Sequence, residues 1–399
     1  MARTLFVDHA GVLGGAELYL LNVVKHMRHN AQVVLFEDGP FMDRLKAEAI
    51  PASILDAPDT VMGVERSGGK LQDLKAIPGI FQMVMRLRRL AKKFDVVYAN
   101  SQKAFIIGAL AGKAAMRPVI WNLHDILTAD HFSASHRKAA VLLANRFADH
   151  VIVNSKATQE AFVACGGRKE KTSIVYNGID ASLFQSVDSQ EVKDLRDGLG
   201  LTGKTVVGLF SRLTEWKGQH VLLEAVAKLP DVHVLLVGGA LFQDDAAYEQ
   251  HLRDMVVKLG IADRVHFLGF RDDVHRIMNA VDIVVHCSTA PEPFGRVIVE
   301  GMLSKKPVIA ANAGGAREIV TEGETGFLVT PGDADALAQA IAKLKTDPEE
   351  ANKMALAGAA EAYQRFAVEN IVKQIETQIR KVIGGPNAVA IAETSASPV

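Results

Sequence analysis

The chain has 399 residues, 49% of them hydrophobic and 23% charged, and its formal net charge is −1. This length fits two domains of ordinary size, and the composition excludes a mainly disordered chain and argues against a dedicated nucleic-acid-binding protein. Two cysteines cannot build a disulfide framework, and no apolar run approaches the ~20 residues of a membrane-spanning helix, so we expect a cytoplasmic protein.

Short apolar runs rich in β-branched residues alternate with longer amphipathic stretches along the chain. Strands that are buried on both faces and alternate with helices are typical of parallel sheets. The predicted strands are 4–8, 31–36, 95–99, 118–122 and 149–153 in the first half, and 205–210, 232–237, 264–268, 282–286, 307–310 and 326–329 in the second. The clearest predicted helices are 16–29, 71–93, 217–229, 244–259 and 333–345. Because the pattern occurs twice, we predict an α/β protein with two doubly wound Rossmann-like domains that face a cleft.

The boundary between the domains is expected near Asn177-Gly178, because Asn-Gly marks a turn and a more polar stretch follows. Residues 59–70 hold several glycines and are predicted to form a mobile loop. The resulting division is 1–180 for the first domain, 181–362 for the second, 363–383 for a last helix and 384–399 for a disordered tail.

Ligands of open parallel sheets bind beyond the carboxyl ends of the strands, so the turns that follow the strands hold the candidate residues. The sharpest segment follows the predicted strand that ends at His286 and contains two acids eight positions apart, Glu292 and Glu300. Glu292 lies in a Pro-rich turn, where it could accept hydrogen bonds from sugar hydroxyls. The backbone N–H groups around Phe294 and Gly295 would form an anion site at a helix start. The alternative is that Glu292 caps this helix and Glu300 is solvated.

A second segment, Ser-Arg212-Leu-Thr-Glu-Trp-Lys217-Gly, also joins a strand to a helix. Arg212 and Lys217 flank the turn, where two cations suit a diphosphate: arginine offers a fork of donors and lysine a point charge. Cations at a helix start are unfavourable next to the helix dipole unless an anion binds there. We therefore favour a diphosphate site over a pair of surface charges.

Two weaker signals lie in the first half. Gly14-Gly15 follows the first predicted strand, and glycines let the backbone approach an anion closely, although the segment matches neither the dinucleotide fingerprint nor a P-loop. His124 follows the strand 118–122 and could contact a sugar hydroxyl or a phosphate. A tight turn and a structural histidine remain the alternatives.

Asp333-Ala-Asp335 has the spacing of a metal-binding acid pair, but it opens an Ala-rich helix after Pro-Gly. We interpret Asp333 as the N-cap and Asp335 as a first-turn acid, and we expect neither a metal nor a cofactor.

Taken together, these segments resemble the retaining family 4 glycosyltransferases, which have the two-domain GT-B architecture. The resemblance covers roughly residues 1–380 and depends most on Glu-x7-Glu at 292–300. It also depends on the motifs at 14–15, 124, 177–180, 211–218 and 314–319. Pro291 and Pro293 depart from the pattern, because many members have Gly or a small residue beside this glutamate.

The resemblance implies roles for residues of the second domain. Arg212 and Lys217 would bind the donor diphosphate. Glu292 would hold donor-sugar hydroxyls with help from the backbone at Phe294 and Gly295, and Glu300 would hold the ribose. The turn Gly269-Phe270-Arg271 would line the base pocket.

The resemblance further implies that His124 lies on the acceptor side near the donor sugar, and that Gly14-Gly15 lies near the diphosphate or the acceptor. The terminal helix, 363–383, would cross back to the first domain.

The expected activity is transfer of a hexosyl group from a UDP-sugar or GDP-sugar to a hydroxyl, with retention at the anomeric carbon, in polysaccharide or glycolipid assembly. Two alternatives remain: a sugar-nucleotide epimerase of the same architecture, and a catalytically silent sugar-nucleotide-binding protein. A nicotinamide dehydrogenase is disfavoured because the dinucleotide fingerprint is missing from both halves.

Basic residues concentrate in the first half, where residues 1–180 hold 23 Lys+Arg and 17 Asp+Glu. Five of these cations fall within 86–93, in a segment that is also apolar. This segment could contact anionic lipid at the inner face of a membrane, near a lipid-linked or oligosaccharide acceptor. The alternative is the polar face of a helix that packs on the sheet.

Overall fold

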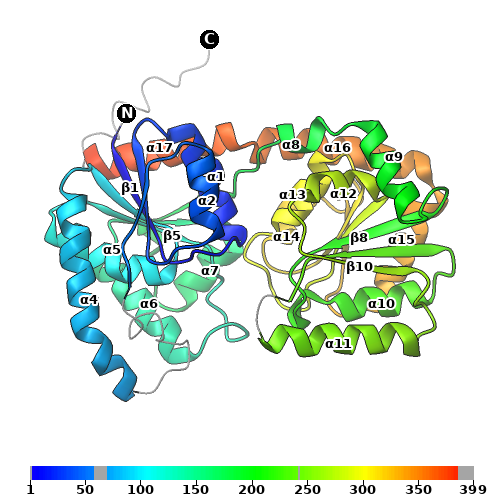
Figure 1. Cartoon of the computed structure of the whole chain (residues 1–399), viewed down its shortest axis with the longest axis horizontal. Coiled ribbons are helices and arrows are strands. Elements are labelled where there is room, and N and C mark those ends of the chain that lie inside the picture. Colours follow the sequence, from blue (N-terminus) through cyan, green and yellow to red (C-terminus); the bar gives the residue numbers. More distant parts are fainter. Residues whose placement is uncertain (1, 58–69, 241–242, 385–399) are drawn as a thin grey trace, which may run out of the picture. The chain divides into compact units, whose positions relative to one another are not determined.

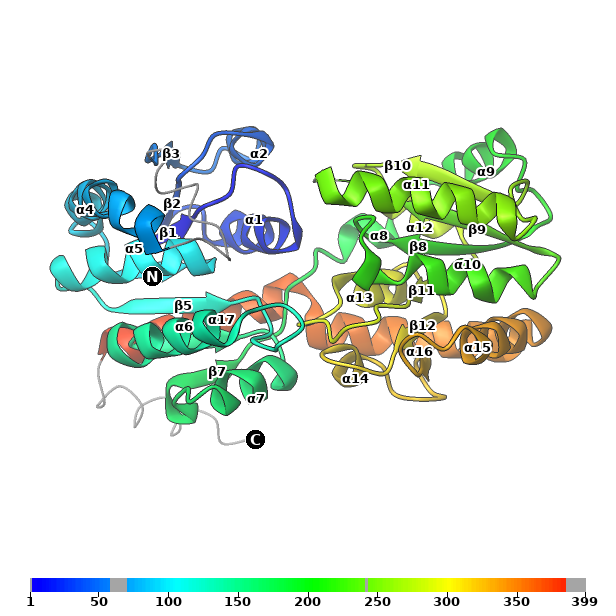
Figure 2. The same cartoon turned by 90° about the horizontal axis from the view of Figure 1, so that it is seen from below.

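The computed structural model describes residues 2–57, 70–240 and 243–384, and it divides into two compact units. Unit 1 comprises residues 1–178 and 368–399, and unit 2 comprises residues 179–367. Each unit contains one sheet whose neighbouring strands are all parallel, with helices on both faces (Figures 1 and 2). The predicted fold class, two doubly wound parallel α/β domains, is thereby confirmed.

Unit 1 holds a seven-stranded sheet in the order β3-β2-β1-β4-β5-β6-β7. Its strands are β1 (Thr4–Asp8), β2 (Ala31–Leu35), β3 (Ala52–Ile54), β4 (Val96–Ala99), β5 (Val119–Leu123), β6 (His150–Val153) and β7 (Thr172–Ile174). Its helices are α1 (Gly15–Met27), α2 (Pro40–Ala47), α4 (Lys70–Ala91), α5 (Gln102–Ala114), α6 (Ala134–Phe147), α7 (Lys156–Ala164) and α17 (Val368–Gly384).

Two apolar layers cover the sheet of unit 1. One layer joins the sheet to α4, α5, α6 and α7, and the buried Trp121 stacks there on Phe105 with 4.6 Å between ring centroids. The other layer joins the sheet to α1, α2 and α17. In α17 the buried residues recur every three or four positions (Val368, Ile371, Ile375 and Ile379), which gives the helix one apolar face toward α1 and the sheet.

Unit 2 holds a six-stranded sheet in the order β10-β9-β8-β11-β12-β13. Its strands are β8 (Thr205–Phe210), β9 (Val232–Val237), β10 (Val265–Gly269), β11 (Ile283–His286), β12 (Val308–Ala311) and β13 (Phe327–Val329). Its helices are α8 (Ser182–Gln185), α9 (Ser189–Gly198), α10 (Gln219–Ala227), α11 (Gln243–Lys258), α12 (Val274–Ala280), α13 (Arg296–Leu303), α14 (Ala316–Ile319), α15 (Ala334–Thr346) and α16 (Pro348–Phe366). The short 3-10 helix η2 (Glu215–Lys217) precedes α10.

The strand order changes direction next to the first strand of each sheet. In unit 1 the chain builds outward from β1 to β3 on one side and from β4 to β7 on the other, and in unit 2 it does the same around β8 and β11. The loops that follow such neighbouring strands diverge to opposite faces of the sheet and leave room for a ligand. The loops after β1 and β4, and those after β8 and β11, are therefore the places where each unit can bind one.

Several predictions differ from the structure. The short strands β3 and β7 were not predicted, and the helix expected over 217–229 begins at Gln219, because Gly218 has a left-handed conformation with φ of 73°. The helix expected over 363–383 is two helices, α16 and α17, which are separated at Ala367. Most of the expected loop at 59–70 and tail at 384–399 lies outside the described residues, although Lys70 opens α4 and Gly384 closes α17.

Among the described residues, no helix is both long enough and apolar enough to cross a membrane.

Candidate active site

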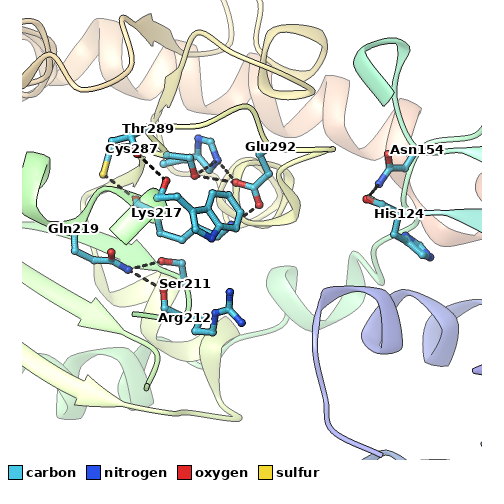
Figure 3. A network of polar contacts seen from close by, with 12 residues as sticks. His124, Asn154, Ser211, Arg212, Lys217, Gln219, Cys287, Thr289 and Glu292 are labelled. Atoms are coloured by element: carbon cyan, nitrogen blue, oxygen red, sulfur yellow. Dashed lines mark hydrogen bonds and ion pairs between the residues drawn. The ribbon is translucent and has the colours of Figure 1, made fainter. Parts of the chain in front are cut away.

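The loops after β8 and β11 in unit 2 bring Lys217 and Glu292 together (Figure 3). His286, the last residue of β11, also contacts Glu292. The ammonium of Lys217 donates to Glu292 Oε1 at 2.5 Å, and His286 Nε2 is hydrogen-bonded to Glu292 Oε2. The hydroxyl of Ser288 donates to the same Oε2 at 3.0 Å. Lys217, His286, Ser288 and Ser211 also line a small pocket between the two loops. The carboxylate of Glu292 is thus held at both of its oxygens.

The charge of Glu292 is stabilised by these neighbours. Burial alone would raise the pKa of this carboxyl, because it disfavours the charged form. Two effects outweigh burial: the charge interactions with Lys217 and His286, and the hydrogen bonds from the same two residues. Together they lower the pKa of Glu292 well below its ordinary value. Glu292 is therefore an ionised acceptor over the whole physiological pH range.

The Lys217 loop is fastened to the loop after β11 by its backbone. The N–H of Thr289 donates to the carbonyl of Trp216 at 2.8 Å, and the Cys287 thiol donates to the carbonyl of Gly218 at 3.0 Å. The Lys217 ammonium also lies 4.2 Å from the centroid of the Trp216 ring, within the range of a cation–π contact. These contacts restrict the ammonium before any ligand arrives.

Gly218 is required for this close approach. Its φ of 73° is unfavourable for other residues, and a Cβ atom there would lie 2.0 Å from the carbonyl oxygen of Cys287. The same holds behind Glu292, where Gly314 has φ of 56° and a Cβ would lie 2.2 Å from the Glu292 carbonyl oxygen. The N–H of Gly315 donates to that carbonyl at 2.8 Å. The Gly314-Gly315 turn therefore packs directly against the backbone of Glu292 and is hydrogen-bonded to it.

The structure also places the other predicted residues of this segment. Gly295, with φ of 105°, precedes α13, as predicted. The side chain of Phe294 is buried and packs against Phe366 with 5.6 Å between ring centroids. Glu300 lies in the second turn of α13 and accepts from Arg296 Nη2 at 3.0 Å, so it is partly buried in an ion pair rather than solvated.

Two further predicted groups lie at the carboxyl ends of β8 and β10. Arg212 follows β8, its carbonyl accepts from Gln219 Nε2 at 2.9 Å, and its side chain extends from the loop (Figure 3). Gly269 ends β10 with φ of 65°, and the next residue, Phe270, exposes 64% of its surface. Arg271 forms two hydrogen bonds with Asp273, of 2.7 and 2.6 Å. Phe270 is thus the part of this turn that exposes an apolar surface.

In unit 1, polar residues form a chain of hydrogen bonds across four strand ends, those of β1, β4, β5 and β6. Asn100, which follows β4, donates from Nδ2 to Asp8 Oδ2 of β1 at 2.6 Å. Its Oδ1 accepts from Asn122 Nδ2 of β5 at 3.2 Å and lies 2.9 Å from His124 Nε2. Asn122 Nδ2 lies 2.8 Å from the same His124 nitrogen, and the His124 carbonyl accepts from Asn154 Nδ2 at 3.3 Å (Figure 3). His124 is thus oriented through both its ring and its backbone.

The Gly14-Gly15 turn of unit 1 is tied to a buried acid. Gly14 is the N-cap of α1, Gly15 is its first residue, and the N–H of Gly14 donates to Glu17 Oε2 at 2.9 Å. Burial, followed by the negative charge of the nearby Asp8, raises the pKa of Glu17 to about 7. The turn therefore ends at a carboxyl group that titrates near neutral pH.

Sequence reasoning missed His286, Ser288, Asp8, Asn100, Asn122 and Glu17 as parts of these networks. Asp8, Asn100, Asn122 and His286 share one signal, which is a polar residue at or just after the end of a buried apolar strand. The rule that ligands bind beyond strand ends could have singled them out.

The Asp333 side chain accepts from the N–H of Ala336 at 2.8 Å and caps α15, as predicted, while Asp335 pairs with Lys228. In the part of the chain that the structure describes, no group of three or more acidic, histidine or cysteine side chains is arranged to hold a metal ion.

Two family models match the chain. The model described as "Glycosyl transferases group 1" matches residues 192–360, and the model described as "Glycosyltransferase Family 4" matches residues 13–183. Both units are thus covered by models of glycosyltransferases.

Known proteins agree with these matches. The chain is 43% identical to HepE of Anabaena, whose crystal structure in complex with UDP and glucose superposes with a TM-score of 0.87 over 96% of this chain and 100% of HepE. EpsD of Bacillus subtilis (strain 168), which is named as a glycosyltransferase, is 31% identical over 71% of this chain and 75% of EpsD. The lipopolysaccharide core biosynthesis glycosyltransferase LpsE of Rhizobium meliloti (strain 1021) is 30% identical over 57% of this chain, and the match spans 62% of LpsE. The chain therefore belongs to the group 1 glycosyltransferases.

Proposed function

We propose that the chain transfers a hexosyl group from a nucleoside-diphosphate sugar to a hydroxyl acceptor, with retention at the anomeric carbon. One observation supports this above all: a carboxylate, Glu292, is held ionised between Lys217 and His286 directly before the helix start at Gly295. A fixed acceptor suits sugar hydroxyls, and an ammonium with a helix start suits a diphosphate.

The donor to test first is UDP-glucose. Crystal structures of HepE hold UDP, UDP-glucose, or UDP with glucose, and HepE shares 43–44% of its residues with this chain. GDP-sugars are the second class to test. In this proposal the turn at Gly269-Phe270-Arg271 contacts the base and Glu300 contacts the ribose. The Arg296–Glu300 pair would have to accommodate the ribose hydroxyls.

Catalysis in this proposal is electrostatic. As the bond to the anomeric carbon breaks, negative charge grows on the diphosphate, and Arg212, Lys217 and the N–H groups near Gly295 stabilise it. Glu292 keeps the sugar in place. We assign no general base, because in a front-face reaction the leaving phosphate assists deprotonation of the acceptor hydroxyl. For His124 and the Gly14-Gly15 turn we propose contacts to the acceptor or to the donor.

A panel of nucleotide sugars, with UDP-glucose and GDP-mannose among them, tests this function in three arms. Binding is measured by thermal shift, where a ligand at ~100 times its Kd should add ~2.7 kcal/mol of stability. Transfer to acceptors is followed by mass spectrometry, and proton NMR gives the anomeric configuration of the product. An inverted product, or a glycosyl adduct on a side chain, would refute the front-face account. An epimer formed from donor alone would indicate an isomerase, and binding without turnover would indicate a silent binding protein.

The metal requirement is tested by the same assay in excess chelator. We expect transfer to continue, because Arg212 and Lys217 would balance the negative charge of the leaving diphosphate. Loss of activity that divalent cations restore would contradict this part of the proposal.

For the acceptor, we propose a lipid-linked or growing saccharide in polysaccharide or glycolipid assembly. The apolar residues Met83, Val84 and Leu87 of α4 are buried in the core, whereas Phe81, Arg86 and Arg89 are exposed. A lipid contact would therefore be mainly electrostatic and made by the exposed cations. Cosedimentation with anionic vesicles should then be lost on adding salt. Failure to cosediment at low salt would remove the membrane contact from the proposal without affecting transfer.

A further inference from the structure

We propose that His286 is a positioning residue, which fixes the Glu292 carboxylate in the orientation that binds the donor sugar. This inference rests on the proposed function, because it assigns a role in the same site. His286 was absent from the residues that the sequence pattern and the family resemblance singled out.

The position of His286 suits this role. It is the last residue of β11, where it pairs in register with Ala310 of β12, and only 5% of its surface is exposed. Glu292 lies in an irregular loop six residues later, which by itself would leave the carboxylate free to rotate. The contact from His286 Nε2 therefore ties a loop side chain to the rigid end of a central strand.

The contact from His286 matters for ligand binding because a carboxylate can accept only a small number of hydrogen bonds. A carboxylate offers roughly four lone-pair positions. Lys217 uses one on Oε1, while His286 and Ser288 use two on Oε2. Roughly one acceptor position is then left for a hydroxyl of a ligand, and its direction is set by the other three. Without His286, the carboxylate keeps its contacts with Lys217 and Ser288 but loses the one that ties Oε2 to the end of β11, so it can tilt and misdirect that position.

The two ring nitrogens of His286 differ in their surroundings. Nε2 contacts both Glu292 Oε2 and the Ser288 hydroxyl, the latter at 3.2 Å. Nδ1 is buried and has no hydrogen-bond partner among the described residues. Donation to Glu292 thus requires the proton on Nε2. A glutamine side chain can place its amide nitrogen near Nε2, whereas an asparagine places it near Nδ1. Both substitutions replace the ring by a smaller polar amide, but glutamine alone can restore a donor at the position of Nε2. Comparing the two variants therefore tests the contact with Glu292 itself.

The experiment compares His286→Gln, His286→Asn and His286→Ala with wild type, using the nucleotide sugar that wild type turns over best. We expect kcat/KM for the donor to fall about 10- to 100-fold in the alanine and asparagine variants, since small displacements of a positioning group cost this much. The glutamine variant should recover most of the loss. The affinity for UDP, which lacks the sugar, should change little in all three. His266→Gln is the matched control, because it replaces a histidine of the same unit whose ring stacks on that of His233.

Direct detection of the contact keeps this inference separate from the proposed function. Nitrogen-15 NMR of labelled protein should show a proton on His286 Nε2, with a shift that changes in Glu292→Gln. Equal kcat/KM values in wild type and the alanine variant would overturn the positioning role, and so would a proportionate loss of UDP affinity or an asparagine variant as active as glutamine. If wild type neither binds UDP nor turns over any nucleotide sugar, the proposed function fails. The NMR result then decides alone whether His286 holds Glu292, and a proton found only on Nδ1 would refute it.

Discussion

Lys217 Nζ lies 2.5 Å from Glu292 Oε1, although 75 positions separate the two residues in the chain. The pair is largely buried, with 16% of the lysine side chain and 14% of the glutamate side chain exposed. A nucleotide sugar that contacts both residues would therefore find two opposite charges that already neutralise each other. The pair keeps the site ordered while no ligand is bound, and its lysine can be shared with a diphosphate.

Removal of one member of this pair should destabilise unit 2 more than removal of both. Lys217→Met leaves a buried carboxylate that keeps its contacts with His286 and Ser288 but has lost its ammonium partner. We expect a loss of about 3 kcal/mol, as for other broken buried pairs. The double variant Lys217→Met/Glu292→Gln should recover part of this loss. Urea denaturation of the single and double variants measures the coupling. Lys353→Met, which breaks an exposed pair with Glu350, is the control and should change stability by less than about 0.5 kcal/mol. Additive effects of the two substitutions would contradict the coupling.

Arg212→Ala should reduce turnover far more than stability. If Arg212 stabilises charge that grows on the leaving diphosphate, its loss costs about 10²–10³ in kcat, while the melting temperature stays near that of wild type. Lys217→Ala should show the loss of turnover together with the destabilisation described above. Arg276→Ala, which removes an exposed arginine paired with Glu191, is the control for loss of a positive charge from the same unit. If Arg212→Ala and Lys217→Ala both turn over substrate nearly as fast as wild type, these two residues do not stabilise the leaving diphosphate.

The fold could be predicted well from the sequence because its main signal is local. The buried parallel strands are runs of apolar β-branched residues, and their ends were located to within one or two positions. The strands β3 and β7 escaped because each has three residues, all only half buried, so neither shows an apolar run. The helix break at Ala367 escaped because no Gly or Pro marks it.

The candidate site was predictable only in part. Its residues at strand ends follow from the topology of parallel sheets, and this is how Lys217 and Glu292 were found. That they contact each other depends on β8 and β11 being neighbours, which no local pattern encodes. The pair between Arg296 and Glu300 is different: their spacing of four in a predicted helix was visible and indicates such an ion pair.

Glu17 should make stability depend on pH in the direction opposite to an acid whose pKa folding lowers, such as Glu292. The pKa of Glu17 is raised in the folded chain from 4.5 to about 7, so the folded chain binds a proton more tightly than the unfolded chain between these values. Stability therefore falls as pH rises from about 4.5 to 7 and stays lowered above this range, by roughly 3 kcal/mol.

Glu17→Gln tests this origin, because the amide oxygen can still accept from the N–H of Gly14 but cannot ionise. Urea denaturation at pH 5 and pH 8 should show wild type losing stability at the higher pH and the variant losing less. Glu160→Gln on α7 replaces an exposed acid of the same unit and should behave as wild type. A variant with the pH dependence of wild type would assign the effect to other groups.

Gly218→Ala should damage the site through a steric clash rather than through backbone conformation alone. Gly218 and Gly260 have similar left-handed conformations, with φ of 73° and 66°. A Cβ at Gly218 would lie 2.0 Å from the Cys287 carbonyl oxygen, whereas nothing lies within 4 Å of a Cβ at Gly260. Gly260→Ala therefore measures the conformational cost by itself, about 1–2 kcal/mol, and should leave turnover unchanged. Gly218→Ala should cost more stability and also lower turnover, because the clash separates the loop of Lys217 from that of Glu292. If the two alanine variants have equal stability and equal turnover, the close approach of the two loops does not matter for the site.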